Sequence, residues 1–403
     1  MATTSRTLHP VLLMIILGSV QAIMPISIDL YLPSLPTIAR EFAVPNGSVQ
    51  FTLAVFLLGV GIGQVVYGPI TDKYGRKRPL LFGFAVYIVG AFVCAQSTSI
   101  ELLIGGRFLQ ALGASAGSVI SSAIARDLWS GKTLADRLSV LMLVLGAAPI
   151  LAPSLGGVLL AVWDWHGVFW VLVAYGCIMA GAVTLLPETS SAQERASVDL
   201  QQAAHTYASI LRNTPFILYV VTASCSSGML MSYITSSSFL YIDMLGATPR
   251  EFGIFFGINA MGLIGAAQLN RLALRRWPLA TIAQAALRSV LCVVALMAGV
   301  VLSMPLSAPL LSLLFLLLTT SLGFLMPNIA ALAFGHIRER MGSASALQGT
   351  IQSLAGGIAG VSIGLLSDGS VWPVIMVVGG WGILANLLWQ RARATTATQP
   401  ASV

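Results

Sequence analysis

Charged residues are scarce in this chain, and their scarcity excludes an ordinary soluble protein. Only 9% of the 403 residues are Asp, Glu, Lys or Arg, whereas 57% are hydrophobic. Soluble domains usually carry about 25% charged residues. Most of the chain is therefore expected to face lipid or other membrane helices.

Cysteine and histidine are also rare. The four cysteines all fall inside apolar segments, where small thiols usually serve as packing residues. Their spacing indicates neither a metal site nor a disulfide framework. The four histidines lie scattered over loops and segment ends, without the spacing of ligands or nucleophiles. We therefore expect no metal, no cofactor and no catalytic residues, which disfavours a membrane enzyme or receptor.

Apolar segments dominate what is present. A run of about 20 apolar residues spans a bilayer, and the sequence contains twelve such windows. They cover 10–32, 48–71, 78–97, 100–125, 136–161, 165–186, 215–239, 250–273, 278–302, 306–332, 343–366 and 370–390. The sequence thus predicts an all-α membrane protein with twelve transmembrane helices. Residues 1–22 could be read as a cleavable signal peptide, but its removal would leave an odd number of spans.

Basic residues alternate in sidedness along these windows. With the N-terminus placed in the cytoplasm, 17 Lys and Arg residues fall on the cytoplasmic side and only Arg40 and Arg250 on the other. This asymmetry predicts that both termini are cytoplasmic. The net charge of +7 is spread over many short loops, so it does not indicate binding to nucleic acid.

The loop at 68–78 carries the strongest motif. It reads Gly-Pro-Ile-Thr-Asp-Lys-Tyr-Gly-Arg-Lys-Arg between two apolar windows. Its basic residues, Arg76 among them, would by themselves only mark the cytoplasmic side, but that interpretation does not account for Gly68, Asp72 and Gly75 at their spacing. The pattern resembles the loop between the second and third helices of the major facilitator transporters.

That resemblance implies a particular organisation. Two six-helix halves, 1–190 and 215–403, would be joined by a cytoplasmic linker at 191–214, where the longest polar stretch lies. The substrate site would lie near the membrane midplane between the halves. Because one chain forms the whole cavity, a monomer is expected.

Three of the 35 charged residues lie well inside apolar windows: Asp29, Arg107 and Arg288. A charge at membrane depth costs about 2.5 to 3.5 kcal/mol and is usually functional. Asp29 shares a helical face of small and polar residues with Gln21 and Pro25, and such a face points into the bundle. It is a candidate proton-coupling residue; alternatively it lies in water at the outer end of the span and caps the following turn.

Arg107 lies in a similar small and polar face of the fourth window, with Gln110 one turn later. It could hold a neighbouring carboxylate and bias proton release, or clamp helices together. Arg288, about ten residues into its window, is interpreted as structural.

We expect the substrate pocket to draw on both halves. Its candidate residues are Asp29, Tyr31, Gln110, Met231, Tyr233, Phe255 and Asn259. Methionine and aromatic side chains suit apolar or amphipathic compounds, although ordinary helix packing would use the same residues.

The loop residues Gly68, Asp72, Gly75 and Arg76 are candidates for a conformational switch, and two other groups join them. Arg126 and Asp127 could pair with Asp72 and the basic loop to latch the cytoplasmic helix ends; alternatively they are solvated surface charges. The fifth window contains Pro149, Pro153, Gly156 and Gly157. It resembles the antiporter motif of drug exporters, with Ala152 in place of its first glycine.

Additional segments narrow the resemblance. They are Asp-Leu-Tyr-Leu-Pro-x-x-Pro from 29, Arg-x-x-Gln-x-x-Gly-Ala-Ser from 107, and Gly-Ser-Ala-Ser-Ala-Leu-Gln-Gly from 342. Together they resemble the bicyclomycin and chloramphenicol resistance (Bcr/CflA-type) branch of bacterial drug–proton antiporters. The resemblance implies an inner-membrane exporter of small molecules that exchanges them for protons, with Asp29 as the carboxylate and Arg107 as its partner. Some relatives carry a second acidic residue where this chain has Gln21, which favours neutral or zwitterionic substrates.

The expected function is therefore proton-coupled multidrug efflux. The main alternative is a facilitator or proton-coupled carrier for a metabolite, such as an amino acid derivative or a sugar. A channel is disfavoured because the sequence has no charged ring or filter-like repeat. The expected partners are a small-molecule substrate, protons and the lipid bilayer.

Overall fold

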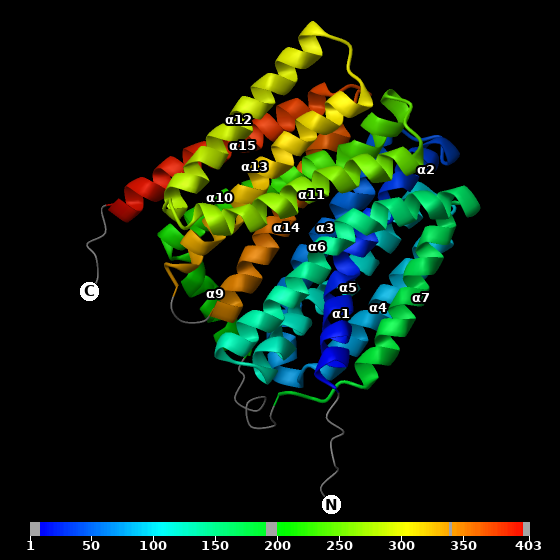
Figure 1. The fold of residues 1–403 in the computed structure, drawn as a ribbon. Helices are drawn as coiled ribbons and strands as arrows, with labels where there is room; N and C mark the ends of the chain where they lie inside the picture. The colour runs from blue at the N-terminus through cyan, green and yellow to red at the C-terminus, as the bar shows by residue number, and fades with distance from the viewer. Residues whose placement is uncertain (1–8, 191–199, 338–340, 398–403) are drawn as a thin grey trace, which may run out of the picture.

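The computed structural model describes residues 9–190, 200–337 and 341–397, and the regular structure of these residues is helical (Figure 1). The first six long helices and their short companions are α1 (Pro10–Asp29), η1 (Leu32–Ser34), α2 (Leu35–Glu41), α3 (Asn46–Tyr74), α4 (Lys77–Ala95), α5 (Ile100–Leu128), α6 (Gly131–Val162) and α7 (Trp165–Thr184). After α9 (Leu200–Leu211) come α10 (Thr214–Ser238), η2 (Phe239–Met244), α11 (Pro249–Ala273), α12 (Leu279–Ser303), α13 (Ala308–Phe334), α14 (Met341–Leu366) and α15 (Trp372–Ala397).

Among the described residues, twelve helices are long and apolar enough to cross a membrane. The twelve-helix, all-α prediction is therefore confirmed. The first span continues past α1 through η1 and α2 to Glu41. Its prolines explain the irregular join, because Pro33 and Pro36 lack the amide hydrogens that a continuous helix would need there. The seventh span is longer than its predicted window, since a π-helical segment, η2, extends it to Met244.

The first six spans gather on one side of the molecule and the last six on the other (Figure 1). Two helix pairs make most of the contact between these groups: α3 packs along α14, and α6 packs along α11. Residues 191–199 of the predicted linker lie outside the described residues. The helix α9 follows and contacts α3, α10 and α14.

The two groups of spans meet most closely at the end away from the start of α1, which we call the closed face. A Cβ added to Gly47 at the start of α3 would overlap the carbonyl oxygen of Gly364 at the end of α14. Similarly, a Cβ on Gly157 of α6 would lie 2.7 Å from the carbonyl oxygen of Pro249 on α11. Further from this face, a Cβ on Gly146 would meet only the Ile264 side chain, at an ordinary 3.5 Å.

An ion pair spans the same face. Arg40 of α2 lies 3.7 Å from Asp243 in η2, so it connects the first six spans to the last six. Both side chains are partly exposed, at 67% and 30%. Exposed pairs of this kind contribute roughly 0–1 kcal/mol. The closed face is therefore held mainly by backbone packing at the glycines.

Candidate functional site

A small cavity lies between the two groups of spans. Its volume is about 140 Å³. It is lined by Met24, Pro25, Ile28, Asp29, Pro149, Leu230, Met231, Tyr233, Ile234, Phe256, Ala260, Leu263 and Thr319. These residues come from α1 and α6 on one side and from α10, α11 and α13 on the other. Asp29 carries the only carboxyl group among these lining residues.

Asp29 is the last residue of α1 and is only 3% exposed. It is therefore buried at the cavity wall, in contrast to the solvent-exposed cap considered from the sequence. No ion pair to Asp29 occurs within the described residues. An isolated buried carboxylate is costly and becomes neutral more readily than it stays charged. The side chain can thus hold a proton at this position.

Arg107 of α5 is fully buried but is not paired with Asp29. Its Nη1 donates to the backbone carbonyl of Ser27 at 3.0 Å and to Gln110 Oε1 at 2.7 Å. The guanidinium carbon lies 4.2 Å from the Phe56 ring centroid and 4.8 Å from that of Tyr31. Arg107 therefore fastens α5 to α1 two residues before Asp29, which is the contact expected of a helix clamp.

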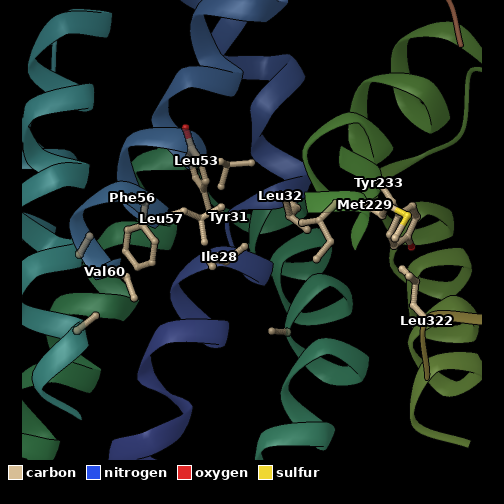
Figure 2. Packing of buried hydrophobic residues seen from close by; sticks show 14 of the residues in the cluster. Ile28, Tyr31, Leu32, Leu53, Phe56, Leu57, Val60, Met229, Tyr233 and Leu322 are labelled. Carbon is tan, nitrogen blue, oxygen red and sulfur yellow. The ribbon is translucent and has the colours of Figure 1, made fainter. Parts of the chain in front are cut away.

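Tyr31 and Gln110, both predicted to bind substrate, are not among the residues that line the cavity. Tyr31 is fully buried within the first six spans, where its hydroxyl lies 3.1 Å from Thr52 Oγ1. Figure 2 shows it beside Leu53 and Phe56, well apart from Tyr233. Both predicted residues contact the Arg107 guanidinium instead. The positions of Tyr31 and Gln110 in the sequence, close to Asp29 and Arg107, did not show that both side chains face Arg107.

In the last six spans, Met231 and Tyr233, two of the candidate substrate-binding residues, line the cavity. Asn259 lies behind it: its Nδ2 donates to the hydroxyls of Tyr233 at 3.2 Å and Tyr241 at 3.3 Å. Asn259 therefore orients Tyr233 rather than lining the cavity itself.

Phe255 differs from the prediction, because it stacks on Tyr241 at 5.3 Å between centroids. The next residue, Phe256, lines the cavity and stacks on Tyr233 at 5.5 Å. Helical phase explains the difference: Phe256, Ala260 and Leu263 follow i, i+4, i+7 spacing on one face of α11.

A charged network surrounds the turn between α3 and α4, at the opposite end from the closed face. Arg76 donates to Asp72 Oδ1 at 2.6 Å, and to Asp127 Oδ2 at 2.8 Å and Oδ1 at 3.3 Å. Burial alone would lower the pKa of Arg76, but the hydrogen bonds that it donates to Asp127 and Asp72 raise its pKa above the ordinary value. The predicted association of Asp127 with the loop is present, whereas Arg126 is exposed and forms no ion pair within the described residues.

Sequence reasoning missed Glu188 in this network. Its carboxylate accepts hydrogen bonds from the backbone amides of Arg76 at 2.8 Å and Lys77 at 3.1 Å. These amides begin α4 and have no partner within the helix, so an acidic residue there is favourable. Within the described residues, the network thus joins α3, α4, α5 and the chain after α7, all from the first six spans.

The two glycines of the loop have different roles. Gly75 has a φ of +86°, which other residues adopt only with strain, and it ends α3. Gly68 faces α9, where a Cβ would lie 2.9 Å from the Tyr207 hydroxyl. Gly68 therefore lies at a contact between the first six spans and α9, the helix that precedes the last six.

The proline and glycine residues of α6 lie along its contacts with other helices. Pro149 and Pro153 lie inside the helix, and Pro149 also lines the cavity. A Cβ on Gly156 would overlap the backbone carbonyl of Leu30, just after α1. The residues resembling an antiporter motif therefore allow α6 to approach α1 and α11 at the closed face.

Comparison with known proteins agrees with this architecture. The model of the Major Facilitator Superfamily matches residues 17–360. The chain belongs to the Major Facilitator Superfamily. As a member of this superfamily, with twelve candidate spans, it is a multi-pass bacterial membrane transporter of small molecules, as the family match and its bacterial relatives indicate.

Three relatives of this facilitator illustrate the range of similarity. It is 32% identical to an uncharacterized MFS-type transporter, YdgK, of Bacillus subtilis, over 90% of this chain and 92% of the relative. It is 29% identical to a bicyclomycin resistance protein homolog of Haemophilus influenzae, over 93% of this chain and 94% of the relative. It is 28% identical to a multidrug resistance protein, MdtL, of Escherichia coli, over 59% of this chain and 60% of the relative. The resemblance to the bicyclomycin resistance branch is thus supported.

Solved transporters share the fold at low sequence identity. The xylose transporter XylE from Escherichia coli, in a partially occluded inward open conformation, matches with a TM-score of 0.73 at 12% identity, over 94% of this chain and 97% of that chain. A POT family transporter in complex with a thioalcohol-conjugated peptide matches with a TM-score of 0.74 at 11% identity, over 96% of each chain. At such identities the likeness concerns the fold alone.

Proposed function

We propose that this member of the superfamily is a proton-coupled exporter of small apolar or amphipathic molecules, working by alternating access. One observation carries the proposal: the Asp29 carboxyl group lies buried at the wall of a cavity that both groups of spans line. No cationic side chain pairs with it among the described residues. A proton and a substrate would therefore compete for the same place.

The coupling follows from the cost of the charged form. When the cavity is closed and dry, a bare carboxylate at Asp29 is unfavourable by several kcal/mol, so the proton stays bound. Access to water on the proton-poor side would release it and leave an anion. Movement of the two groups around Asp29 would then be linked to protonation. Arg107 supports this arrangement by fixing α1 through the Ser27 carbonyl at 3.0 Å.

The direction of opening follows from the charge asymmetry. If the side rich in Lys and Arg is cytoplasmic, both chain ends lie in the cytoplasm and the closed face is periplasmic. The structure then corresponds to a conformation closed toward the outside. The chain would reside in the bacterial inner membrane as a monomer, because its cavity is formed within one chain.

The lining favours apolar or amphipathic substrates without a strong positive charge. Methionines, aromatic rings and prolines surround Asp29, and Gln21 occupies the place where some relatives carry a second acidic residue. Sites for drug-sized ligands usually measure about 300–1,000 Å³, so the cavity of about 140 Å³ must widen when substrate enters. The bicyclomycin and multidrug resistance names of its relatives support antibiotics as substrates.

The test is drug susceptibility of an efflux-deficient bacterium that expresses the chain, beside Asp29→Asn at matched membrane levels. We expect raised tolerance to bicyclomycin-like or phenicol-like compounds, abolished by a protonophore and absent in the variant. Normal tolerance with Asp29→Asn would contradict the role of Asp29. No protection across a broad drug panel would instead indicate a metabolite carrier, and uptake assays would then replace export assays.

A further inference from the structure

A groove opens on the outer surface of the last six spans, between α12 and α13. Its volume is about 530 Å³, and one end reaches the short connection from α11 to α12. Its walls include Trp277, Thr281, Ala285, Ser289, Thr320 and Phe324. Ser289 and Ser321 hydrogen-bond to each other at 2.8 Å, so these two hydroxyls already have partners. The groove therefore offers a mainly apolar surface at membrane depth, which suits a hydrocarbon chain.

Arg288 flanks this groove in an unusual place for a charge. It lies nine residues after the start of α12, roughly 14 Å along the helix at 1.5 Å per residue. It is exposed, and it follows Thr281 and Ala285 at helical spacing on the groove side of α12. No ion pair to Arg288 occurs among the described residues. A charge on a lipid-facing surface needs an anion or a route to the headgroups.

The surrounding chain supplies positive charge and no negative charge. Residues 252–337 contain no Asp or Glu but four arginines: Arg271, Arg275, Arg276 and Arg288. Arg275 and Arg276 are exposed and directly precede Trp277, which is 52% exposed at the end of the groove. On the other side of α12, Gln284 accepts a hydrogen bond from Arg393 of α15 at 3.0 Å. This surface is therefore complementary to an anion.

We propose that the groove binds one anionic phospholipid from the adjacent leaflet. An acyl chain lies between α12 and α13, and the phosphate lies at the Trp277 end, within the field of Arg276 and of the Arg288 side chain extended toward the headgroups. Tryptophan is suited to that level because its ring is amphipathic. A zwitterionic lipid would fill the same groove but would gain less from the arginines. This inference is independent of the proposed transport activity.

Brominated lipids test the site directly, because bromine quenches nearby tryptophan fluorescence. The full-length protein would be reconstituted with brominated phosphatidylglycerol or brominated phosphatidylcholine, each diluted into unbrominated lipid. The contribution of Trp277 is the difference between the wild type and Trp277→Phe. We expect this contribution to show preference for phosphatidylglycerol. An arginine near anionic lipid is worth about 1 kcal/mol, so Arg288→Gln and Arg276→Gln should each lower the preference about fivefold.

Three controls make the result specific. Arg250→Gln removes an exposed arginine at the closed face and should leave the preference unchanged. Arg288→Lys keeps the charge and should retain most of it. Ala285→Phe fills the groove without changing charge and should reduce quenching by both lipids. Three results would overturn the proposal. They are equal quenching by the two lipids in the wild type, an undiminished preference for phosphatidylglycerol in both glutamine variants, and a loss of that preference with Arg250→Gln as large as theirs. Since Arg276 lies on an exposed connection, its variant remains informative if Arg288→Gln folds poorly.

Discussion

Gly47 on α3 lies against the backbone of Gly364 on α14, so close that a Cβ at Gly47 would overlap the Gly364 carbonyl oxygen. This contact joins the first six spans to the last six at the closed face. Because neither partner is a flexible side chain, an added side chain can be accommodated only if the helices separate. The closed face is therefore the most sensitive place for small substitutions.

We expect Gly47→Val to shift the protein away from the closed arrangement. The reporter is a cysteine at position 50, because Gln50 lies one turn further along α3 and is only 2% exposed. In a background without the four native cysteines, Gln50→Cys should react slowly with a membrane-impermeant thiol reagent. Gly47→Val should raise that rate at least tenfold. Gly105→Val is the matched control, because a Cβ at Gly105 has nothing within 4 Å.

The Arg40–Asp243 ion pair at the same face should contribute much less. Its partners are partly exposed, so Arg40→Gln should change the thiol reaction rate by less than about fivefold, corresponding to less than about 1 kcal/mol. A larger effect than that of Gly47→Val would show that charge, rather than backbone packing, holds this face.

The two carboxylates that bind Arg76 should differ in their effect on stability. Asp127 makes a two-point contact and its side chain is 21% exposed, whereas the Asp72 side chain is 55% exposed. Charge-assisted hydrogen bonds contribute about 1.5–3 kcal/mol when shielded from water. We therefore expect Asp127→Asn to lower the melting temperature of the purified protein clearly more than Asp72→Asn. The reverse order would contradict the account of this network.

Two adjacent phenylalanines on α11 differ in their relation to the cavity. Phe256 lines the cavity, whereas Phe255 stacks on Tyr241 outside it. We expect Phe256→Ala to change the relative resistance to different drugs by several-fold, because it enlarges and reshapes the cavity. Phe255→Ala should lower resistance to all drugs together or not at all. Minimum inhibitory concentrations across one drug panel, at equal membrane levels, would compare the two variants.

The spans could be predicted from the sequence because apolar length alone determines them, and the 68–78 loop marked the family. The cavity was only partly predictable. Asp29 stood out because charges inside apolar windows are rare. The position of Tyr31 and Gln110 beside Arg107, away from the cavity, could not be predicted because it depends on how α1, α3 and α5 meet. Glu188 escaped notice because its partners, the amides of Arg76 and Lys77, are more than 100 residues away in sequence. The contact of Gly47 with Gly364 likewise depends on tertiary packing alone.

Proton exchange by Asp29 is the central claim, and purified protein in liposomes tests it most directly. The liposomes would carry a pH-sensitive dye and an imposed pH gradient, and a transported drug would be added to start exchange. The wild type should move protons down the gradient when drug is present. Asp29→Asn should bind drug with affinity within several-fold of the wild type but move no protons in response. Drug-dependent proton movement at the wild-type rate in Asp29→Asn would contradict the account.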